Sequence, residues 1–149
     1  MEISNDILKK VIREVLEEYG KQETVEEIPK TVSPGGVFSI DAPRVKCPPF
    51  DVGVKADVKL RDLVTLEESP NLGCGILEIS NSTYPWELTG YEEFYYVVSG
   101  QLDVITETKT ISGTEGQIIF IPKGASIKFS SPSKCRAVYF TFPADWANS

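Results

Sequence analysis

Two stretches, EFYYVVSG at residues 93–100 and GQIIFIPKG at residues 116–124, carry the spacing that decides the fold of this chain. In the first stretch, Gly100 follows Glu93 after six intervening residues. In the second, five residues separate Gly116 from Pro122-Lys123-Gly124. Gly100 suits a tight hairpin turn between adjacent strands, at Ser99-Gly100. Gly116 opens a strand, and Pro122-Lys123-Gly124 turns the chain at the end of that strand. Together they predict neighbouring strands of a small barrel.

Outward from these stretches, the β pattern runs from about residue 37 to the C-terminus. Short segments rich in valine, isoleucine, phenylalanine and tyrosine alternate with glycine, proline, asparagine and serine. Many short strands at regular spacing, with no helical pattern of useful length between them, predict an all-β sandwich or barrel. The predicted strands are 37–40, 57–64, 73–79, 92–99, 101–107, 116–121, 125–130 and 135–142.

The first 36 residues differ in pattern from the rest of the chain. Apolar residues spaced three and four apart over 3–19 predict an amphipathic helix, which Gly20 ends. Residues 21–36 are polar, contain two prolines and predict a linker. The expected organisation is therefore a helix in 1–20, a linker in 21–36 and one β-barrel domain in 37–149. The helix must bury its apolar face on its own domain, on a dimer mate or on another protein.

The composition excludes several kinds of chemistry. The 149 residues include no histidine, so a Ser-His-Asp triad, a two-histidine iron site and a histidine zinc site are all impossible. A formal net charge of −7 argues against nucleic acid and anionic membranes as partners. The sequence contains no transmembrane run and no signal peptide, and three scattered cysteines suit reduced thiols in a cytosolic protein.

The spacings Glu-x₆-Gly and Gly-x₅-Pro-x-Gly resemble the two motifs of the cupin family. This resemblance implies a single jelly-roll β-barrel domain. Of the four metal ligands that the family usually carries, only Glu93 is present, so we expect no transition metal. The three histidine positions hold Trp86 and Leu88, or Glu87 and Thr89 in the other register, and Ile127.

A closer resemblance rests on three segments: YPWELTGYEE at 84–93, IFIPKGASI at 119–127 and FPADW at 142–146. They are similar to the EutQ family of ethanolamine utilization proteins. That resemblance implies a homodimer of the bacterial cytoplasm, associated with a microcompartment. It also implies an acetate kinase that forms acetate and ATP from acetyl phosphate and ADP. The 3–19 helix is similar to encapsulation peptides, which would make shell or cargo proteins its partners.

Several residues are candidates for the site, although no nucleotide-binding motif occurs. A carboxyl group among apolar barrel residues must be paired or have a raised pKa, so Glu93 is the first candidate and a potential Mg²⁺ ligand beside ATP or ADP. Aromatic side chains suit an adenine ring or an acyl pocket, and cations suit phosphate. The candidate catalytic residues are Glu93, Glu87 and Tyr95, and the candidate ligand-binding residues are Tyr84, Trp86, Glu92, Arg136 and Lys123.

Because side chains alternate along a strand, the direction of Glu93 also decides which residues of the same strand face outward. If Glu93 points into the barrel, so do Tyr95 and Val97, and residues 94, 96 and 98 form an apolar outer face suited to a dimer. Three functions stay open on this basis. They are an acetate kinase, a non-catalytic binding or assembly module of the microcompartment, and a small-molecule sensor with its pocket at the barrel mouth.

Overall fold

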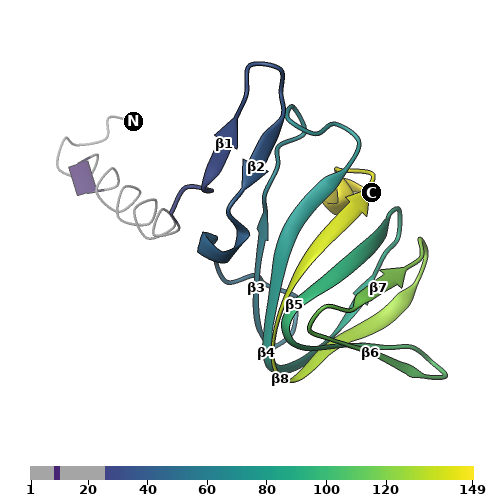
Figure 1. Ribbon diagram of the computed structural model, residues 1–149. Coiled ribbons are helices and arrows are strands. Elements are labelled where there is room, and N and C mark those ends of the chain that lie inside the picture. The colour runs from purple at the N-terminus through teal and green to yellow at the C-terminus, as the bar shows by residue number, and fades with distance from the viewer. Residues whose placement is uncertain (1–8, 11–25) are drawn as a thin grey trace, which may run out of the picture.

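The computed structural model describes residues 9–10 and 26–149, and this part of the chain is built almost entirely of β-strands (Figure 1). Two 3₁₀ turns, at Ala42–Arg44 and Trp146–Asn148, accompany the strands. The predicted all-β class is confirmed. The strands are β1 (Lys30–Val32), β2 (Phe38–Ile40), β3 (Asp57–Asp62), β4 (Gly73–Glu87), β5 (Glu92–Ile105), β6 (Thr110–Thr114), β7 (Ile118–Ile121) and β8 (Ser126–Phe142).

Six of these strands form one antiparallel sheet in the order β3-β4-β8-β5-β6, with β7 pairing the first half of β5 on the same edge as β6. The three central strands β4, β5 and β8 are 15, 14 and 17 residues long. Antiparallel strands of this length twist and curve, and Figure 1 shows the sheet bending round so that one face becomes concave. That concave face encloses the core.

The hairpin predicted at Ser99-Gly100 is wrong, because residues 92–105 form the single strand β5. Gly100 lies where the pairing of β5 with β8 shifts register, and its φ is +76°. A Cβ atom at this position would lie 1.8 Å from the carbonyl oxygen of Lys134. Glycine is needed here for a close approach of two backbones at a bulge, a role with the same sequence signature as a turn.

Other predicted boundaries also change. The predicted segments 125–130 and 135–142 belong to one strand, β8. The predicted strand 73–79 continues to Glu87 as β4. Within β4, Asn81 has a φ of 42° and lies where the pairing with β8 shifts register. The pattern missed β6, in which Ile111 is the single large apolar residue. The expectations for the second stretch are confirmed: Gly116 precedes β7, and the backbone N–H of Gly124 donates to Leu88 O at 2.7 Å in the turn that follows.

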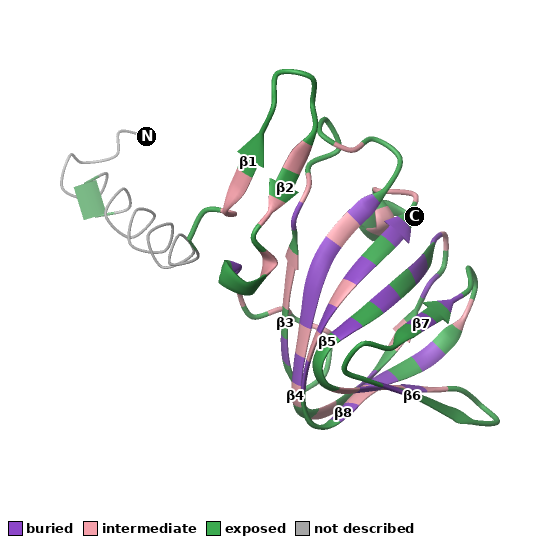
Figure 2. Ribbon diagram, in the orientation of Figure 1, coloured by how far each residue is buried: buried purple, intermediate pink, exposed green. Residues whose placement is uncertain are grey.

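Burial alternates along the central strands, as Figure 2 shows. On β5, Glu93, Tyr95 and Val97 are buried, whereas Phe94, Tyr96 and Val98 are exposed. The condition set by the sequence is therefore met: Glu93 points inward, and Tyr95 and Val97 share its face. The main core, on the concave face, is made of side chains from β3, β4, β5, β7 and β8 and includes Tyr84, Leu102, Phe129 and Tyr139.

A second, smaller core lies on the convex side of β4. Val45, Leu63 and Ile76 are buried there under the β1-β2 hairpin and the loop that follows it. Arg136 fastens this loop, because its guanidinium donates to the carbonyl oxygens of Ala42 and Val45, at 2.6 and 2.9 Å. The convex faces of β4 and of β8 around Arg136 and Val138 are thus partly covered, while those of β5, β7 and the end of β8 are open.

The N-terminal predictions fall mostly outside the described part of the chain. The expected helix over 3–19 lies there, apart from Lys9 and Lys10. Strand β1 lies within 21–36, where the composition predicts a linker. Lys30 holds this end on the domain by donating to Leu63 O at 3.0 Å and pairing with Glu68 at 2.7 Å. In the described residues, no helix is long and apolar enough to cross a membrane, and the three cysteines are free thiols.

Candidate functional site

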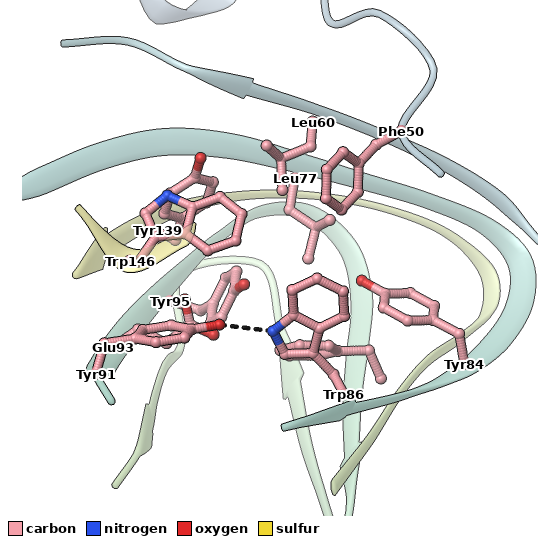
Figure 3. A pocket seen from close by; sticks show the side chains of 11 residues that line it. Phe50, Leu60, Leu77, Tyr84, Trp86, Tyr91, Glu93, Tyr95, Tyr139 and Trp146 are labelled. Carbon is pink, nitrogen blue, oxygen red and sulfur yellow. Dashed lines mark hydrogen bonds between the residues drawn. The ribbon is translucent and has the colours of Figure 1, made fainter. Parts of the chain in front are cut away.

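A narrow pocket opens into the concave face of the sheet, between the central strands and the C-terminal turn (Figure 3). Its floor is buried, and Phe50, Trp86 and Trp146 form a half-buried rim. The space that a water-sized group can occupy inside is about 10 Å³, about enough for one water molecule. The lining residues are Phe50, Leu60, Leu77, Tyr84, Trp86, Tyr91, Glu93, Tyr95, Phe129, Tyr139 and Trp146.

Aromatic rings form most of the wall and fix one another by edge and tilted contacts. Trp86 lies 6.2 Å from Tyr84 and 6.2 Å from Trp146, measured between ring centroids, and Tyr91 lies 5.8 Å from Trp146. The indole N–H of Trp86 donates to the hydroxyl of Tyr91 at 2.6 Å, the dashed line in Figure 3. These contacts tie β4, the turn before β5 and the C-terminus together around one space.

Glu93 is the one carboxylic acid that lines this pocket. The side chain is 4% exposed, and its Oε1 atom has no hydrogen-bond partner among the described residues. Burial raises the pKa of Glu93 to about 8, and the nearby Tyr95 hydroxyl offsets part of the rise. The free pocket therefore holds a mostly neutral carboxyl group at pH 7, with an acceptor oxygen that nothing satisfies.

The tyrosines around Glu93 stay neutral. Burial raises the pKa of Tyr84, Tyr91 and Tyr95, and the negative charge of an ionised Glu93 raises each pKa further. The pKa of Tyr139 is also raised, by burial first and then by Asp62, whose carboxylate accepts the Tyr139 hydroxyl hydrogen bond. The floor of the pocket is thus a ring of phenols around one carboxyl group.

The structure brings four of the predicted site residues together: Tyr84, Trp86, Glu93 and Tyr95 all line the pocket. The remaining four lie elsewhere. Glu87 and Glu92 are exposed, and Lys123 is exposed in the turn after β7. Arg136 is committed to Glu78 and to two backbone carbonyl groups on the convex side of the sheet.

Four aromatic lining residues outside the 84–95 segment were not predicted from the sequence: Phe50, Phe129, Tyr139 and Trp146. Trp146 is supplied by the C-terminal 3₁₀ turn, and its indole N–H donates to Asp62 at 3.0 Å. The FPADW segment at 142–146 carried a family resemblance, which was the available signal for Trp146. Phe50, Phe129 and Tyr139 had none, since aromatic residues in a β sequence are ordinarily core.

The residues of this pocket do not fit the metal that cupin barrels usually hold. The described part of the chain has no group of three or more cysteine, aspartate or glutamate residues that could bind a metal ion. Of the two registers open for the first two histidine positions, Glu87 and Thr89 are exposed, whereas Leu88 is buried and Trp86 half-buried, and Ile127 at the third position is buried. Mg²⁺ at Glu93 does not fit either, because this ion keeps several oxygen ligands and waters, and the free space holds about one water.

Comparison with solved structures gives the class of protein first. The cupin domain of Schizosaccharomyces pombe Cnp3 superposes with a TM-score of 0.56 at 13% identity, covering 75% of this chain and 80% of that one. The fold is therefore that of a cupin barrel.

Sequence comparison then gives the family. The chain matches "Ethanolamine utilisation protein EutQ" over residues 2–148. A Clostridioides difficile protein named "Acetate kinase EutQ" is 41% identical over 99% of each chain. The solved C. difficile EutQ structure has a TM-score of 0.79 and covers 83% of this chain and 93% of that one, at 41% identity. The chain belongs to the EutQ family.

A longer relative is also similar. The Salmonella typhimurium protein named "Acetate kinase EutQ" is 38% identical over 75% of this chain, but the match spans 48% of that protein. The chain therefore corresponds to about half of the Salmonella protein.

Proposed function

We propose that this chain is an acetate kinase of ethanolamine utilisation, converting acetyl phosphate and ADP to acetate and ATP. The observation that carries the proposal is 41% identity, over 99% of both chains, to a C. difficile protein of that name. Membership of the EutQ family supports the pathway. The cofactors of this proposal are ADP and ATP with Mg²⁺.

The geometry limits where this reaction takes place. Phosphoryl transfer depends on neutralising the phosphate oxygens with metal ions, lysine or arginine. No basic side chain is among the residues that line the barrel pocket, and Glu93 would repel a phosphate whenever it is ionised. The proposal therefore assigns the phosphate groups to a surface outside the pocket. It retains Glu93 and Tyr95 as groups that contact a small ligand inside.

The test is a coupled assay for ATP from acetyl phosphate, ADP and Mg²⁺ with the full chain. We expect a rate above the protein-free blank that scales with protein concentration, and a rate equal to the blank would refute the kinase proposal. The variant Glu93→Gln tests the predicted catalytic role of this carboxyl group. A tenfold or larger fall is typical of losing an acid–base group, whereas an unchanged rate excludes Glu93 from the reaction.

A second candidate function, a non-catalytic assembly module, is favoured by the outer apolar face. We define this face as Phe94, Tyr96, Val98, Ile118, Phe120, Phe140 and Phe142, all exposed on β5, β7 and β8 (Figure 2). Phe94 is its centre, 4.8 Å from Phe120 between ring centroids and paired in register with Phe140. Contiguous apolar patches of this kind mark protein interfaces.

The proposed occupant of the outer apolar face is a second copy of the chain. A two-fold axis would pack the outer apolar face of one chain against the same face of the other chain, which suits a surface that is apolar throughout. The measurement is the mass in solution by light scattering over a concentration series. We expect a dimer, and a monomer at all concentrations would refute this assembly.

The segment 3–19 is proposed to direct the protein to a bacterial microcompartment through shell or cargo proteins. The support is its sequence pattern, an apolar face on a helix of encapsulation-peptide length. Residues 1–20 fused to a fluorescent protein should give punctate signal in cells that make ethanolamine-induced shells. Diffuse signal would count against this localisation, and the same fusion in shell-free cells is the control.

A further inference from the structure

The barrel pocket combines an aromatic wall, a buried carboxyl group and no basic side chain. We propose that this pocket binds a small primary ammonium ion, R–NH₃⁺, with Glu93 as its counter-ion. The proposal goes beyond the kinase reaction, whose substrates are anions, and does not rest on it. It assigns the pocket a ligand of the opposite charge.

The wall provides the geometry that a cation needs. A cation is attracted to the face of an aromatic ring when it lies within about 6 Å of the ring centroid, most strongly for tryptophan. The neighbouring rings of the wall are 5.8 to 6.2 Å apart between centroids, from Tyr84 through Trp86 and Trp146 to Tyr91. An ion in the space that these rings line is therefore flanked by several aromatic side chains.

The charges select the same class of ligand. Glu93 Oε1 is buried, points into the pocket and accepts no hydrogen bond from the described residues (Figure 3). A buried carboxylate needs a charged or hydrogen-bonding partner, and an ammonium group is both. The phenol oxygens of Tyr84, Tyr91 and Tyr95 belong to the same pocket and add acceptors. The net charge of −7 also attracts cations to the protein.

The size of the pocket selects a primary ammonium group. The part of the pocket that a water-sized group can occupy is about 10 Å³, which suits one group the size of water. An –NH₃⁺ group is of that size, whereas a trimethylammonium group is several times larger. The rest of the ligand must leave through the rim, where Phe50, Trp86 and Trp146 are half-buried rather than sealed. A short alkylammonium ion fits this description.

Binding must be linked to proton release. The titratable groups that face Glu93 are tyrosines from every side: Tyr84 on β4, Tyr91 and Tyr95 on or before β5, and Tyr139 on β8. Strand β7 contributes Ile119 and Ile121, which do not titrate. None of these groups is charged near neutral pH, so Glu93 is mostly protonated in the free pocket. An incoming ammonium ion displaces that proton.

The experiment is isothermal titration calorimetry of the full chain with ethanolamine hydrochloride, a primary ammonium probe suggested by the family, and with methylammonium chloride. We expect saturable binding of one ion per chain. Titrations at about pH 6.5 in two buffers of different ionisation enthalpy should report close to one proton released per ion. The affinity should rise about tenfold per pH unit up to about pH 8 and then level off. Choline chloride and sodium acetate should give no saturable heat.

Two variants locate the site. Glu93→Gln should lose at least tenfold in affinity and all of the proton release, while the exposed control Glu115→Gln should match wild type. Thermal unfolding by circular dichroism checks that each variant is folded. If Glu93→Gln fails to fold, proton release by the wild-type protein decides whether Glu93 is the counter-ion, because an ammonium site that does not include Glu93 would release no proton.

Absence of saturable binding by both probes would overturn the proposal. Equal binding of choline, preferential binding of acetate, or unchanged affinity in folded Glu93→Gln would do the same. The titration contains neither acetyl phosphate nor nucleotide. A protein that binds ethanolamine without making ATP therefore refutes only the kinase proposal, and one that makes ATP without binding ethanolamine refutes only this one.

Discussion

The unpartnered carboxyl group of Glu93 should make the folded protein lose stability as the pH rises. Glu93→Gln keeps the shape of the side chain and removes the ionisation, so the difference between this variant and wild type isolates the carboxyl group. The pKa of Glu93 rises from an ordinary value of 4.5 to about 8 in the folded protein, because burial opposes the charged form. The folded state therefore holds its proton more tightly than the unfolded state does.

The sign and the size of the effect follow from this difference. Below pH 4.5 the carboxyl group is protonated in both states and costs nothing. Between pH 4.5 and about 8 the unfolded chain releases the proton and the folded chain keeps it, so the free energy of unfolding falls by about 1.4 kcal/mol per pH unit. The total loss in wild type is on the order of 4 kcal/mol by about pH 8.

Urea denaturation at about pH 5, 7 and 8.5 measures the free energy of unfolding. Relative to Glu93→Gln, wild type should lose stability steadily across this range, and Glu115→Gln should follow wild type. Addition of ethanolamine at the highest pH should recover part of the loss, because the ion supplies the missing partner. Parallel pH curves for wild type and Glu93→Gln would refute the reasoning, since they would mean that the carboxyl group is already solvated or paired.

Gly100→Ala should cost more than about 3 kcal/mol in urea unfolding, because its Cβ would lie 1.8 Å from Lys134 O at a φ of +76°. Gly116→Ala, with a similar φ and open space, should cost about 1 kcal/mol. Equal losses of stability in Gly100→Ala and Gly116→Ala would mean that the positive φ alone, and not the contact with Lys134 O, sets the cost. Arg136→Met should cost about 2 kcal/mol, because two carbonyl groups and a carboxylate lose their donor; a neutral result would show that water replaces it. Phe94→Lys should halve the mass measured by light scattering, and an unchanged dimer would exclude the outer apolar face.

Much of the fold could be predicted because it depends on local pattern. Alternation of apolar and polar residues gave the strands, and it also placed Glu93, Tyr95 and Val97 on one face, since side chains of a strand alternate whatever the strand pairs with. Strand continuity could not be predicted. A glycine at a bulge and a glycine in a turn share the same preference for positive φ, so Gly100 suggested a hairpin inside what is one strand.

Part of the candidate site could be predicted from the sequence, and part could not. Tyr84, Trp86, Glu93 and Tyr95 lie close in sequence, on β4 and β5, and the prediction that they belong to a site is consistent with their common pocket. Glu87 was predicted beside Glu93 because its position aligns with a former metal ligand, but the pleat of β4 turns it outward, where it is exposed. Arg136 was chosen for its charge alone, and its partners come from residues 42, 45 and 78.

The sequence by itself determined the all-β class, the absence of imidazole chemistry and the grouping of Glu93, Tyr95 and Val97 on one face of a strand, because composition and alternation are properties of the chain. Only the tertiary structure decided that this face points inward and what surrounds the carboxyl group of Glu93. Phe50, Tyr139 and Trp146 line the same pocket from positions up to 96 residues apart in the chain, and the curvature of the sheet brings them together. That convergence replaces water and cations by aromatic rings, and so sets both the raised pKa of Glu93 and the kind of ligand that the pocket can accept.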